Sequence, residues 1–351
     1  MADAPSLSLF APPAERRLPA HGGDVAWAEG RFGKPSGGWL DLSTGINPDG
    51  YPIPSVPEAL WHRLPTSGDL ADLAIAAAEA YRAPVEAVVL SAGSEAVLAL
   101  LPRLLAPTKV AILSPGYGSH AIAWKAAGHR IQSMAAENVL ADRLGETRIL
   151  VVGNPNNPDG VRFPPDVLLG IADRLQQQGG LLVVDEAFAD GEPETSLGSH
   201  AGREGLVVFR SIGKFYGLAG LRLGCALAAP RLASALREGL GAWPVSGPAC
   251  LIGAKALHDR AWRDAAGGKL QTRGAALDAV LEKAGLNIVG RTLLFRLIRS
   301  TGARTLFNRL AEQGILVRAF IERSEWLRIG LADDHGLARL SAALDAIRTA
   351  P

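Results

Sequence analysis

Short runs of consecutive apolar residues recur along the chain and predict buried strands. The clearest runs occupy residues 88–90, 110–113, 149–152, 181–184 and 206–209. Apolar runs without polar alternation are typical of strands that are covered on both faces, as in a parallel sheet. Helical patterns, such as residues 165–178, separate several of the runs. The order of elements therefore predicts an α/β fold with a largely parallel sheet.

The chain divides into three predicted parts. Residues 1–40 are rich in Pro and Gly, and we expect an N-terminal arm with little regular structure. Residues 41–235 are predicted to form a large α/β domain, and residues 236–351 a smaller C-terminal α+β domain. The smaller domain opens with a helical pattern over residues 250–284. Its strand candidates are residues 286–289, 293–298, 315–317 and 326–329.

The composition is that of an ordinary globular enzyme. The chain has 351 residues, of which 48% are hydrophobic and 20% charged. Because the net charge is +1 and no basic stretch is extended, we do not expect nucleic acid as a partner. No apolar run reaches the roughly 18 residues of a membrane span, so no membrane association is expected.

The cysteines and histidines predict neither disulfides nor a metal site. Cys225 and Cys250 are the only cysteines and lack metal-type spacing, so we expect free thiols in a reducing compartment. The seven histidines form no ligand-type cluster along the sequence. The N-terminus has no basic region followed by an apolar core, so we expect no secretory signal and a cytoplasmic location.

Polar or glycine residues follow each predicted strand, and these positions carry the candidate chemistry. They include Gly93, Tyr117, Asn157, Asp185 and Lys214. In an open α/β sheet, ligands bind beyond the carboxyl ends of the strands. The five residues are therefore expected to converge at one edge of the sheet, although more than a hundred positions separate the first from the last.

Lys214 is the most informative of these residues because it lies in a run of small and apolar residues. Lysine normally lies on solvated surfaces, and burial lowers the pKa of its amine. Such an amine is a usable nucleophile, for example in a Schiff base with a carbonyl cofactor. Ser211 precedes Lys214 and Arg222 follows it, and both side chains are suited to binding a phosphate.

A phosphorylated aromatic aldehyde such as pyridoxal phosphate would find a partner for each of its groups. Its phosphate needs backbone N–H donors, which the turn at Gly93, Ser94 and Glu95 supplies. Its pyridine nitrogen needs a carboxylate, which Asp185 supplies. The remaining partners are the amide of Asn157 for the phenolic oxygen, the ring of Tyr117 for stacking and the amine of Lys214 for the aldehyde.

Each motif alone has an ordinary structural explanation. A carboxylate such as Asp185 can cap a helix, and the Asn-Pro-rich segment around Asn157 can be a plain turn. Ser94 can be a helix N-cap, and Tyr117 can be a packing residue. All of these motifs occur in the required order, each behind an apolar strand, and this combination favours the cofactor site.

The same motifs resemble the fold type I, class I/II aminotransferase superfamily, and within it the histidinol-phosphate aminotransferase branch. The matching segments are Ser-Ala-Gly-Ser-Glu-Ala (91–96), Ser-Pro-Gly-Tyr (114–117), Asn-Pro-Asn-Asn-Pro-Asp-Gly (154–160), Val-Asp-Glu-Ala-Phe (184–188) and Ser-Ile-Gly-Lys (211–214). The resemblance covers about residues 20–345. It implies the pyridoxal-phosphate-dependent transferase fold, pyridoxal 5′-phosphate as cofactor, and a homodimer with active sites at the subunit interface.

The resemblance also implies roles for individual residues. Lys214 is the implied Schiff-base lysine, Asp185 the pyridinium partner and Asn157 the partner of the phenolic oxygen. Tyr117 is the implied stacking ring. The implied phosphate cradle comprises Gly93, Ser94, the backbone of Glu95, Ser211 and Arg222. Arg328, in the segment Trp-Leu-Arg-Ile-Gly, matches the arginine that binds the substrate carboxylate; its alternative is an exposed strand arginine.

Two positions depart from the aminotransferase pattern. Phe188 stands where aminotransferases usually have a tyrosine that bonds the phenolic oxygen. Leu64, before Pro65, stands where a neighbouring subunit commonly contributes a tyrosine to the phosphate. The first change removes one donor to the cofactor, and the second puts the intersubunit contact in doubt.

The segments His-Gly-Gly-Asp (21–24) and Ile-Asn-Pro (46–48) resemble the threonine-phosphate decarboxylases of cobalamin biosynthesis, which also carry Phe at the position of Phe188. This resemblance implies decarboxylation of L-threonine O-3-phosphate to (R)-1-aminopropan-2-yl phosphate, a small phosphorylated amino acid being the substrate. His21 is then expected near the substrate phosphate; its alternative is an exposed arm residue.

Two other functions fit the sequence. The first is an aminotransferase acting on histidinol phosphate or an aromatic amino acid, because the cofactor residues serve either reaction. The second is a non-catalytic regulator or scaffold with a degenerate aminotransferase fold. The intact set of Lys214, Asp185, Asn157 and Arg222 argues against this second alternative.

Overall fold

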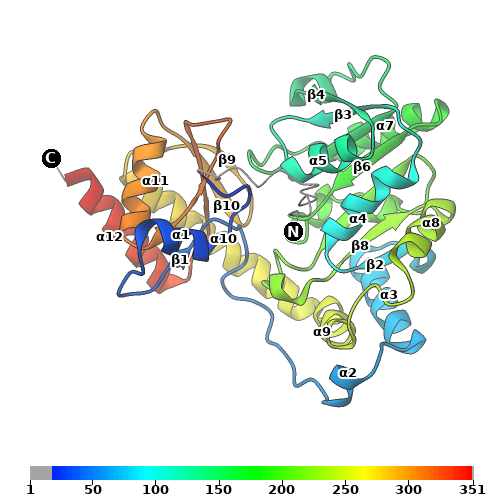
Figure 1. Cartoon of the computed structure of the whole chain (residues 1–351), viewed down its shortest axis with the longest axis horizontal. Coiled ribbons are helices and arrows are strands. Elements are labelled where there is room, and N and C mark those ends of the chain that lie inside the picture. Colours follow the sequence, from blue (N-terminus) through cyan, green and yellow to red (C-terminus); the bar gives the residue numbers. More distant parts are fainter. Residues whose placement is uncertain (1–17, 350–351) are drawn as a thin grey trace, which may run out of the picture.

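The computed structural model describes residues 18–349 and shows two lobes (Figure 1). The larger lobe contains a seven-stranded sheet, and the smaller lobe a four-stranded sheet and a two-stranded sheet. Residues 1–17, which include most of the segment tested for a secretory signal, lie outside the described residues. The predicted division of the chain at residues 40 and 235 stays a prediction.

The seven-stranded sheet is mostly parallel, as predicted. Its strand order is β2-β8-β7-β6-β5-β3-β4, and only β8 runs antiparallel to its neighbours. The strands are β2 (Val88–Ser91), β3 (Lys109–Leu113), β4 (Arg130–Met134), β5 (Ile149–Gly153), β6 (Leu181–Asp185), β7 (Leu206–Ser211) and β8 (Gly224–Ala228). All five predicted strands of this sheet are present. The apolar pattern missed β4, an edge strand with three exposed residues, and β8, which has no β-branched residue.

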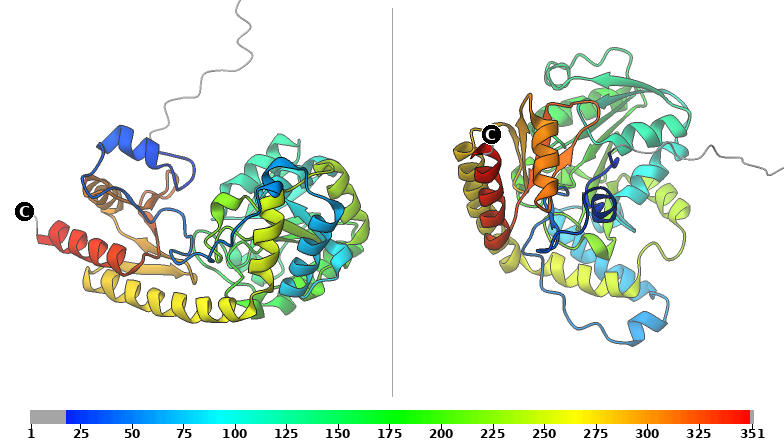
Figure 2. Two further views of the ribbon diagram at one scale, coloured as in Figure 1. Left: turned by 90° about the horizontal axis from the view of Figure 1, so that it is seen from below. Right: turned by 60° about the vertical axis from the view of Figure 1, so that its left-hand side comes forward.

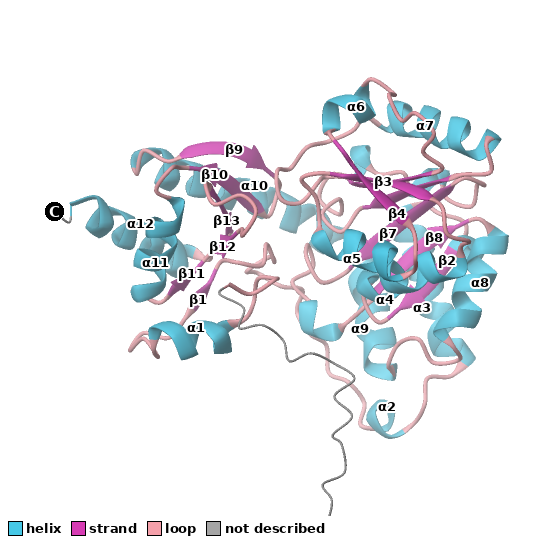
Figure 3. Ribbon diagram, turned by 45° about the horizontal axis from the view of Figure 1, so that its top comes forward, coloured by secondary structure: helices cyan, strands magenta, loops and turns pink. Residues whose placement is uncertain are grey.

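Both faces of this sheet are covered, which explains the continuous apolar runs (Figure 3). Along β6, Leu182 and Val184 belong to one core cluster, whereas Val183 belongs to the cluster on the opposite face. Successive side chains of a strand alternate between faces, so a strand with two dry faces needs apolar residues throughout.

Helices on the two faces bury their apolar stripes against these clusters. One face is covered by α4 (Ser94–Leu100), α5 (Gly118–Ala126) and α8 (Pro230–Leu240), and the other by α3 (Ser67–Tyr81), α7 (Pro165–Gln177) and α9 (Gly247–His258). The short helix α6 (Ala136–Leu140) adds Val139 to the second of these clusters, whereas the short helix α2 (Ala59–His62) buries no residue. A capping box between Thr66 and Asp69 fixes the start of α3.

The smaller lobe is built around an antiparallel sheet of order β12-β13-β10-β9. Its strands are β9 (Asn287–Arg291), β10 (Phe295–Arg299), β12 (Arg318–Ala319) and β13 (Trp326–Gly330). The helices of this lobe are α1 (Val25–Phe32), α11 (Ala303–Glu312) and α12 (Asp334–Thr349). The long helix α10 (Arg260–Lys283) runs from the large lobe into the small one (Figure 2).

A two-stranded parallel sheet pairs a segment near the N-terminus with a segment near the C-terminus. It pairs β1 (Leu40–Asp41) with β11 (Ile315–Leu316). The predicted strand 315–317 is present as β11, whereas β12, which follows it in a different sheet, was not predicted. This pairing places the residues that follow β1, such as Ser43, beside β13, where Arg328 lies.

Two expectations about helices were also wrong. The described part of the N-terminal arm contains α1, which begins after the N-cap Asp24. The expected single helix over residues 250–284 is two helices, α9 and α10. Asp259 separates them, ending α9 and capping α10 through a bond from Trp262 N to its carboxylate at 2.9 Å.

Within residues 18–349, no helix is both long and apolar enough to cross a membrane.

Candidate active site

Lys214 lies three residues beyond the carboxyl end of β7, at the edge of the sheet where the sequence predicted a site. The side chain is largely buried, and its Nζ donates to the carbonyl of Thr44 at 3.4 Å. Burial lowers the pKa of Lys214 to about 8, with repulsion from Arg328 as a further cause. A lysine with this pKa has a substantial unprotonated fraction near neutral pH, as a nucleophilic amine requires.

Asp185 ends the neighbouring strand β6, and His120 holds its carboxylate. His120 Nε2 lies 3.0 Å from Asp185 Oδ2, and Ala187 N donates to Asp185 Oδ1 at 3.1 Å. The His120 ring is buried and stacks on Phe209, with centroids 6.4 Å apart and planes at 7°. Nε2 is therefore the ring nitrogen that faces the carboxylate.

The sequence analysis counted His120 among seven unclustered histidines and missed this role. One signal was available: His120 follows Tyr117 by three residues, in the first turn of the helix after β3.

The predicted phosphate cradle assembles where β2 turns into α4. Gly93 has a φ of +81°, and a Cβ there would lie 2.7 Å from Arg222 Nη2. Gly224 faces Ser211 across the β7–β8 register, and a Cβ on it would lie 2.6 Å from Ser94 N. Both glycines therefore let a guanidinium and backbone N–H groups approach one point closely.

The hydroxyl of Ser211 and the backbone of Glu95 complete this predicted cradle. Ser211 Oγ accepts from Gly213 N at 3.4 Å, which leaves its own proton for donation. The backbone of Glu95 continues the turn after Ser94, while its carboxylate accepts a bond from Tyr117 OH at 3.1 Å. The structure thus brings all five predicted cradle residues together.

Arg328 lies on β13, and its buried guanidinium bonds neutral acceptors and forms no ion pair with a carboxylate of residues 18–349. Its Nη1 donates to Asn157 Oδ1 and its Nη2 to the carbonyl of Ser43, both at 2.6 Å. Burial lowers the pKa of Arg328 to about 10, and the charge of Arg318 adds to this. Two neutral acceptors leave a positive charge that a bound carboxylate would balance.

Asn157 follows β5 and is held by this same bond. Its Oδ1 is used by Arg328, so its Nδ2 remains as the donor that a phenolic oxygen would need. The alternative of an exposed arginine at 328 is therefore wrong. Asn157 lies in a turn, and its role toward a cofactor stays a prediction.

Tyr117 and His21 come together although nearly a hundred positions separate them. Their ring centroids lie 5.7 Å apart. Burial raises the pKa of Tyr117 to about 12, so its hydroxyl stays protonated near neutral pH. His21 is exposed beside the site, so the arm reaches this edge of the sheet.

The two departures from the aminotransferase pattern lie in different places. The ring centroid of Phe188 lies 5.8 Å from Lys214 Nζ and 5.1 Å from the ring of Phe295, so an apolar ring occupies this wall of the site. Leu64 follows α2 and is 60% exposed. It makes no part of the site formed by this chain's described residues.

Arg318 and Asp41 are further site residues that the sequence analysis missed. Arg318 donates to the carbonyls of Pro19 and Ala20, both at 2.6 Å, and burial lowers its pKa. The charge of Asp41 acts on both Lys214 and Arg328, in each case raising the pKa. The available signal was a charged residue at the end of a short apolar strand.

Among the described residues, no three or more His, Cys, Asp or Glu side chains are grouped in a way that would hold a metal ion.

On an α/β sheet, a nucleophilic lysine beside a carboxylate is typical of enzymes that use an aldehyde cofactor. The chain belongs to the family of class I and II aminotransferases, whose model matches residues 40–347. The predicted superfamily and fold class are thereby confirmed.

Two relatives are similar over nearly their whole length. The threonine-phosphate decarboxylase of Sinorhizobium sp is 45% identical over 327 residues, covering 92% of this chain and 97% of that protein. The threonine-phosphate decarboxylase of Pseudomonas aeruginosa is 43% identical, covering 92% of this chain and 96% of that protein.

The fold is similar to the solved structure of histidinol-phosphate aminotransferase from Sinorhizobium meliloti in complex with pyridoxal-5′-phosphate. The TM-score is 0.77 at 22% identity, and the match covers 97% of this chain and 95% of that one.

Proposed function

We propose that this chain catalyses the pyridoxal-phosphate-dependent decarboxylation of L-threonine O-3-phosphate, a step of cobalamin biosynthesis. The products are (R)-1-aminopropan-2-yl phosphate and carbon dioxide. The observation that carries the proposal is the 45% identity to a threonine-phosphate decarboxylase over 92% of the chain. A site with a nucleophilic lysine and an unneutralised buried arginine supports it.

The residues present fit pyridoxal phosphate. A cradle that a Cβ at Gly93 would fill lies beside Arg222, and the amine of Lys214 has a lowered pKa. When bound, the cofactor supplies an electron sink for the pair released from the substrate Cα. We assign Lys214 to the aldehyde carbon, Asp185 to the pyridine nitrogen and Asn157 to the phenolic oxygen. The further assignments are Tyr117 to the ring face, and Gly93, Ser94, the backbone of Glu95, Ser211 and Arg222 to the phosphate.

Arg328 is assigned to the α-carboxylate of the substrate. Its two neutral partners, Asn157 and Ser43, hold the guanidinium in place before substrate arrives. Holding the carboxylate group orients the bond from Cα to the carboxyl carbon, and orientation decides which bond at Cα breaks. The apolar ring of Phe188 excludes water from the same wall of the site.

His21 and Arg318 are assigned to the phosphate end of the substrate. Arg318 is partly buried and its two bonds go to neutral carbonyls, so its charge is also unbalanced. A phosphate dianion would balance it. Because Arg318 and Arg328 bond only neutral acceptors among the described residues, each keeps a positive charge that one of the two anionic groups of the substrate can balance.

Lys214 is assigned a second task after carbon dioxide leaves. With a pKa of about 8 its amine can hold a proton near neutral pH and deliver it to Cα. Replacing Lys214 by Ala is expected to abolish the visible absorbance of the lysine-bound cofactor and to lower kcat by at least about 10²-fold.

The decisive assay supplies L-threonine O-3-phosphate without any oxo acid. Release of carbon dioxide with formation of the amino alcohol phosphate is the expected result. Strict dependence on 2-oxoglutarate would instead establish the aminotransferase alternative, which the fold likeness to histidinol-phosphate aminotransferases keeps as the second candidate. A protein that takes up no pyridoxal phosphate would indicate the non-catalytic alternative.

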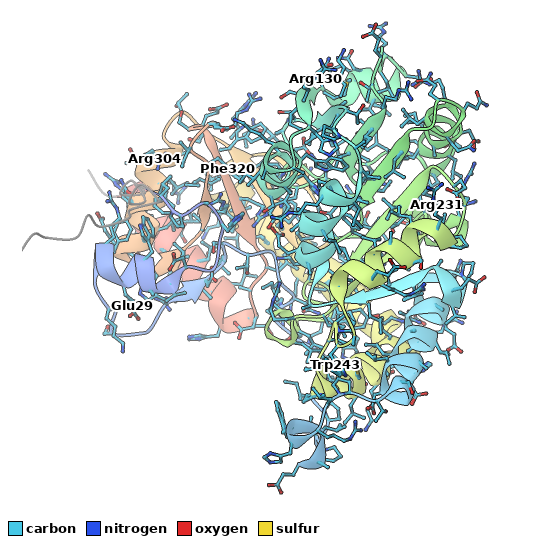
Figure 4. The ribbon with its side chains drawn as sticks, turned by 45° about the vertical axis from the view of Figure 1, so that its right-hand side comes forward. Glu29, Arg130, Arg231, Trp243, Arg304 and Phe320 are labelled. Carbon is cyan, nitrogen blue, oxygen red and sulfur yellow. The ribbon has the colours of Figure 1, made fainter. Side chains whose placement is uncertain are left out.

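We also propose that the protein is a homodimer. Exposed apolar side chains gather where α2 approaches the start of α9, since a Cβ on Gly247 would lie 2.9 Å from the carbonyl of Leu60. Trp61, Leu64 and Trp243 are 64%, 60% and 58% exposed. Figure 4 labels Trp243 on this part of the molecule. Exposed apolar patches of this kind mark interaction sites, and two-fold dimers are the commonest oligomers. A monomeric mass by light scattering at micromolar concentration would contradict the proposal.

A cytoplasmic location is proposed from the two thiols. Cys225 and Cys250 are both buried and unpaired, as expected in a reducing compartment. Cell fractionation followed by immunoblotting tests this location.

A further inference from the structure

Residues 19–23, which we call the arm segment, are held at both ends beside the site. At one end, Arg318 donates to the carbonyls of Pro19 and Ala20, both at 2.6 Å. At the other end, Gly23 N donates to Ser43 Oγ at 2.7 Å. His21 lies between these two attachments, with its ring centroid 5.7 Å from that of Tyr117.

The carboxylate of Asp41 sets the direction of the Ser43 hydroxyl. A backbone N–H can only donate, so Ser43 Oγ must accept from Gly23. The single proton of the hydroxyl goes to Asp41 Oδ1, 2.5 Å away, and Ser43 N donates to the same oxygen at 2.8 Å. Ser43 is 1% exposed, so water does not compete for these bonds. Asp41, Ser43 and Gly23 therefore form one directed chain of hydrogen bonds.

The two glycines of the arm segment make this approach possible. A Cβ on Gly22 would lie 2.3 Å from the carbonyl oxygen of Ser43, a distance that no side chain tolerates. Gly23 has a φ of +88°, a conformation that strongly favours glycine. The His-Gly-Gly motif is thus explained by close packing of the arm segment on Ser43.

The backbone carbonyls of Ser43 and Thr44 accept hydrogen bonds from Arg328 and Lys214. The carbonyl of Ser43 accepts from Arg328 Nη2 at 2.6 Å, and the carbonyl of Thr44 accepts from Lys214 Nζ at 3.4 Å. Ser43 therefore touches the arm segment through its side chain and the carboxylate-binding arginine through its backbone. Any shift of Ser43 moves both.

We propose that Asp41 and Ser43 are positioning residues that hold the arm segment and Arg328 in a single arrangement, and so set the affinity for the phosphate-bearing substrate. This inference rests on the proposed function for the identity of the substrate. In this arrangement Asp41 and Ser43 touch neither the substrate nor the cofactor. They act through His21 at the phosphate end and through Arg328 at the carboxylate end.

The test compares Ser43→Ala with Ser234→Ala, which removes an exposed serine hydroxyl on α8. The first readout is hydrogen exchange, followed by mass spectrometry, in the holoenzyme without substrate. Loss of the bond to Gly23 is expected to speed exchange in a peptide spanning the arm segment by about fivefold or more. Exchange in β7 reports whether the variant is folded and is expected to stay unchanged.

The second readout is steady-state kinetics with L-threonine O-3-phosphate. Ser43→Ala is expected to raise KM by about fivefold to tenfold with kcat little changed, because the variant loses the side-chain bond to the arm segment but keeps the backbone carbonyl that accepts from Arg328. Asp41→Asn keeps an acceptor oxygen but loses the charge, so it should give a smaller rise in both readouts. Ser234→Ala should match the parent enzyme.

Unchanged exchange in the arm segment of Ser43→Ala would overturn the inference, and so would faster exchange with an unchanged KM. Failure of the proposed function shows differently, since the parent enzyme would then release no carbon dioxide from L-threonine O-3-phosphate. The exchange comparison needs no substrate and would still decide whether Ser43 holds the arm segment.

Discussion

The amine of Lys214 experiences opposing effects from its surroundings. Burial and the charges of Arg328 and Arg222 lower its pKa, while Asp185 and Asp41 raise it, and the result is about 8. The sequence indicated the low pKa only through the small, apolar residues around the lysine. The arginine that adds most to the effect of burial lies more than a hundred positions away, on β13.

The first prediction concerns this arginine. Arg328→Gln removes a repelling charge, so we expect the pKa of Lys214 to rise above about 8. The measurement is the rate of pyridoxal phosphate uptake by cofactor-free enzyme as a function of pH, whose midpoint should move to higher pH. Arg299→Gln, on the exposed end of β10, is the control and should leave the midpoint in place. An unmoved midpoint in Arg328→Gln would contradict the electrostatic explanation.

A second prediction follows from the same group by linkage. In the cofactor-free protein the folded-state pKa of Lys214, about 8, lies below its ordinary value of 10.5. Between these two values the unfolded chain binds more protons than the folded chain, so the contribution of Lys214 to stability rises with pH. Urea denaturation at several pH values in this window should show a steeper rise for the parent protein than for Lys214→Met. Equal slopes would show that the amine is not desolvated.

At the scale of elements, the turns between strands and helices set the distances between the residues of the candidate site. The turn from β2 into α4 depends on Gly93, which no other residue type can replace without displacing Arg222. The order of strand, glycine turn and helix was predictable from the sequence. The partner of Gly93 was not, because Arg222 precedes β8, and β8 lies beside β2 only through its antiparallel insertion between β2 and β7.

Gly93→Ala is therefore expected to weaken cofactor binding by about 10-fold to 100-fold, the equivalent of one charge-assisted hydrogen bond. The methyl group would lie 2.7 Å from Arg222 Nη2, so the guanidinium must move. Spectrophotometric titration with pyridoxal phosphate gives the Kd. Gly118→Ala is the matched control, since nothing lies within 4 Å of a Cβ at that position. Equal Kd values in the two variants would exclude the cradle at Gly93.

The strands β6 and β7 are also joined by a buried charge cluster beneath the site. Arg210 donates to Glu186 and, at 2.5 Å, to Asp190, and its guanidinium lies 4.3 Å from the ring centroid of Tyr81. Glu186 directly follows Asp185, and Arg210 directly precedes Ser211. The cluster thus connects two residues of the site through their chain neighbours.

Arg210→Met should destabilise the protein by about 3–5 kcal/mol, because two buried carboxylates lose their cation. Burial already raises the pKa of both Glu186 and Asp190, and removal of Arg210 raises the pKa of each further. When the folded-state pKa of a carboxyl is raised, the contribution of that group to the free energy of unfolding falls as pH rises. The destabilisation measured by urea denaturation should therefore shrink as pH falls from neutral toward acid. A pH-independent loss would point to packing alone.

At the scale of the whole molecule, the site forms where the two lobes meet. Lys214, Asp185 and the predicted phosphate cradle come from the large lobe, whereas Arg328 and Arg318 come from the small lobe. The pairing of β1 with β11 brings Ser43 and the arm segment to the same place. The apolar patch at α2 and the start of α9 lies elsewhere, on the large lobe.

Charging that patch should separate the proposed dimer. The double variant Trp61→Asp, Trp243→Asp places two carboxylates on side chains that are 64% and 58% exposed. Desolvating these charges in an interface is costly, so we expect a monomer at micromolar concentration by light scattering. Leu140→Asp, on α6 at the opposite edge of the sheet, is the control for an exposed apolar residue. An unchanged mass for the double variant would place the dimer interface elsewhere.

The sequence by itself determined the largely parallel sheet, the polar residues at its carboxyl edge and the candidate cofactor residues around Lys214. These features are local, since each is written in an apolar run and the few residues that follow it. Only the tertiary structure decided which distant groups act on them: His120 on Asp185, Arg328 on Asn157, and the chain from Asp41 through Ser43 to the arm segment. These contacts join positions separated by up to 171 residues, and such pairings depend on how the lobes and sheets pack, which local patterns do not specify.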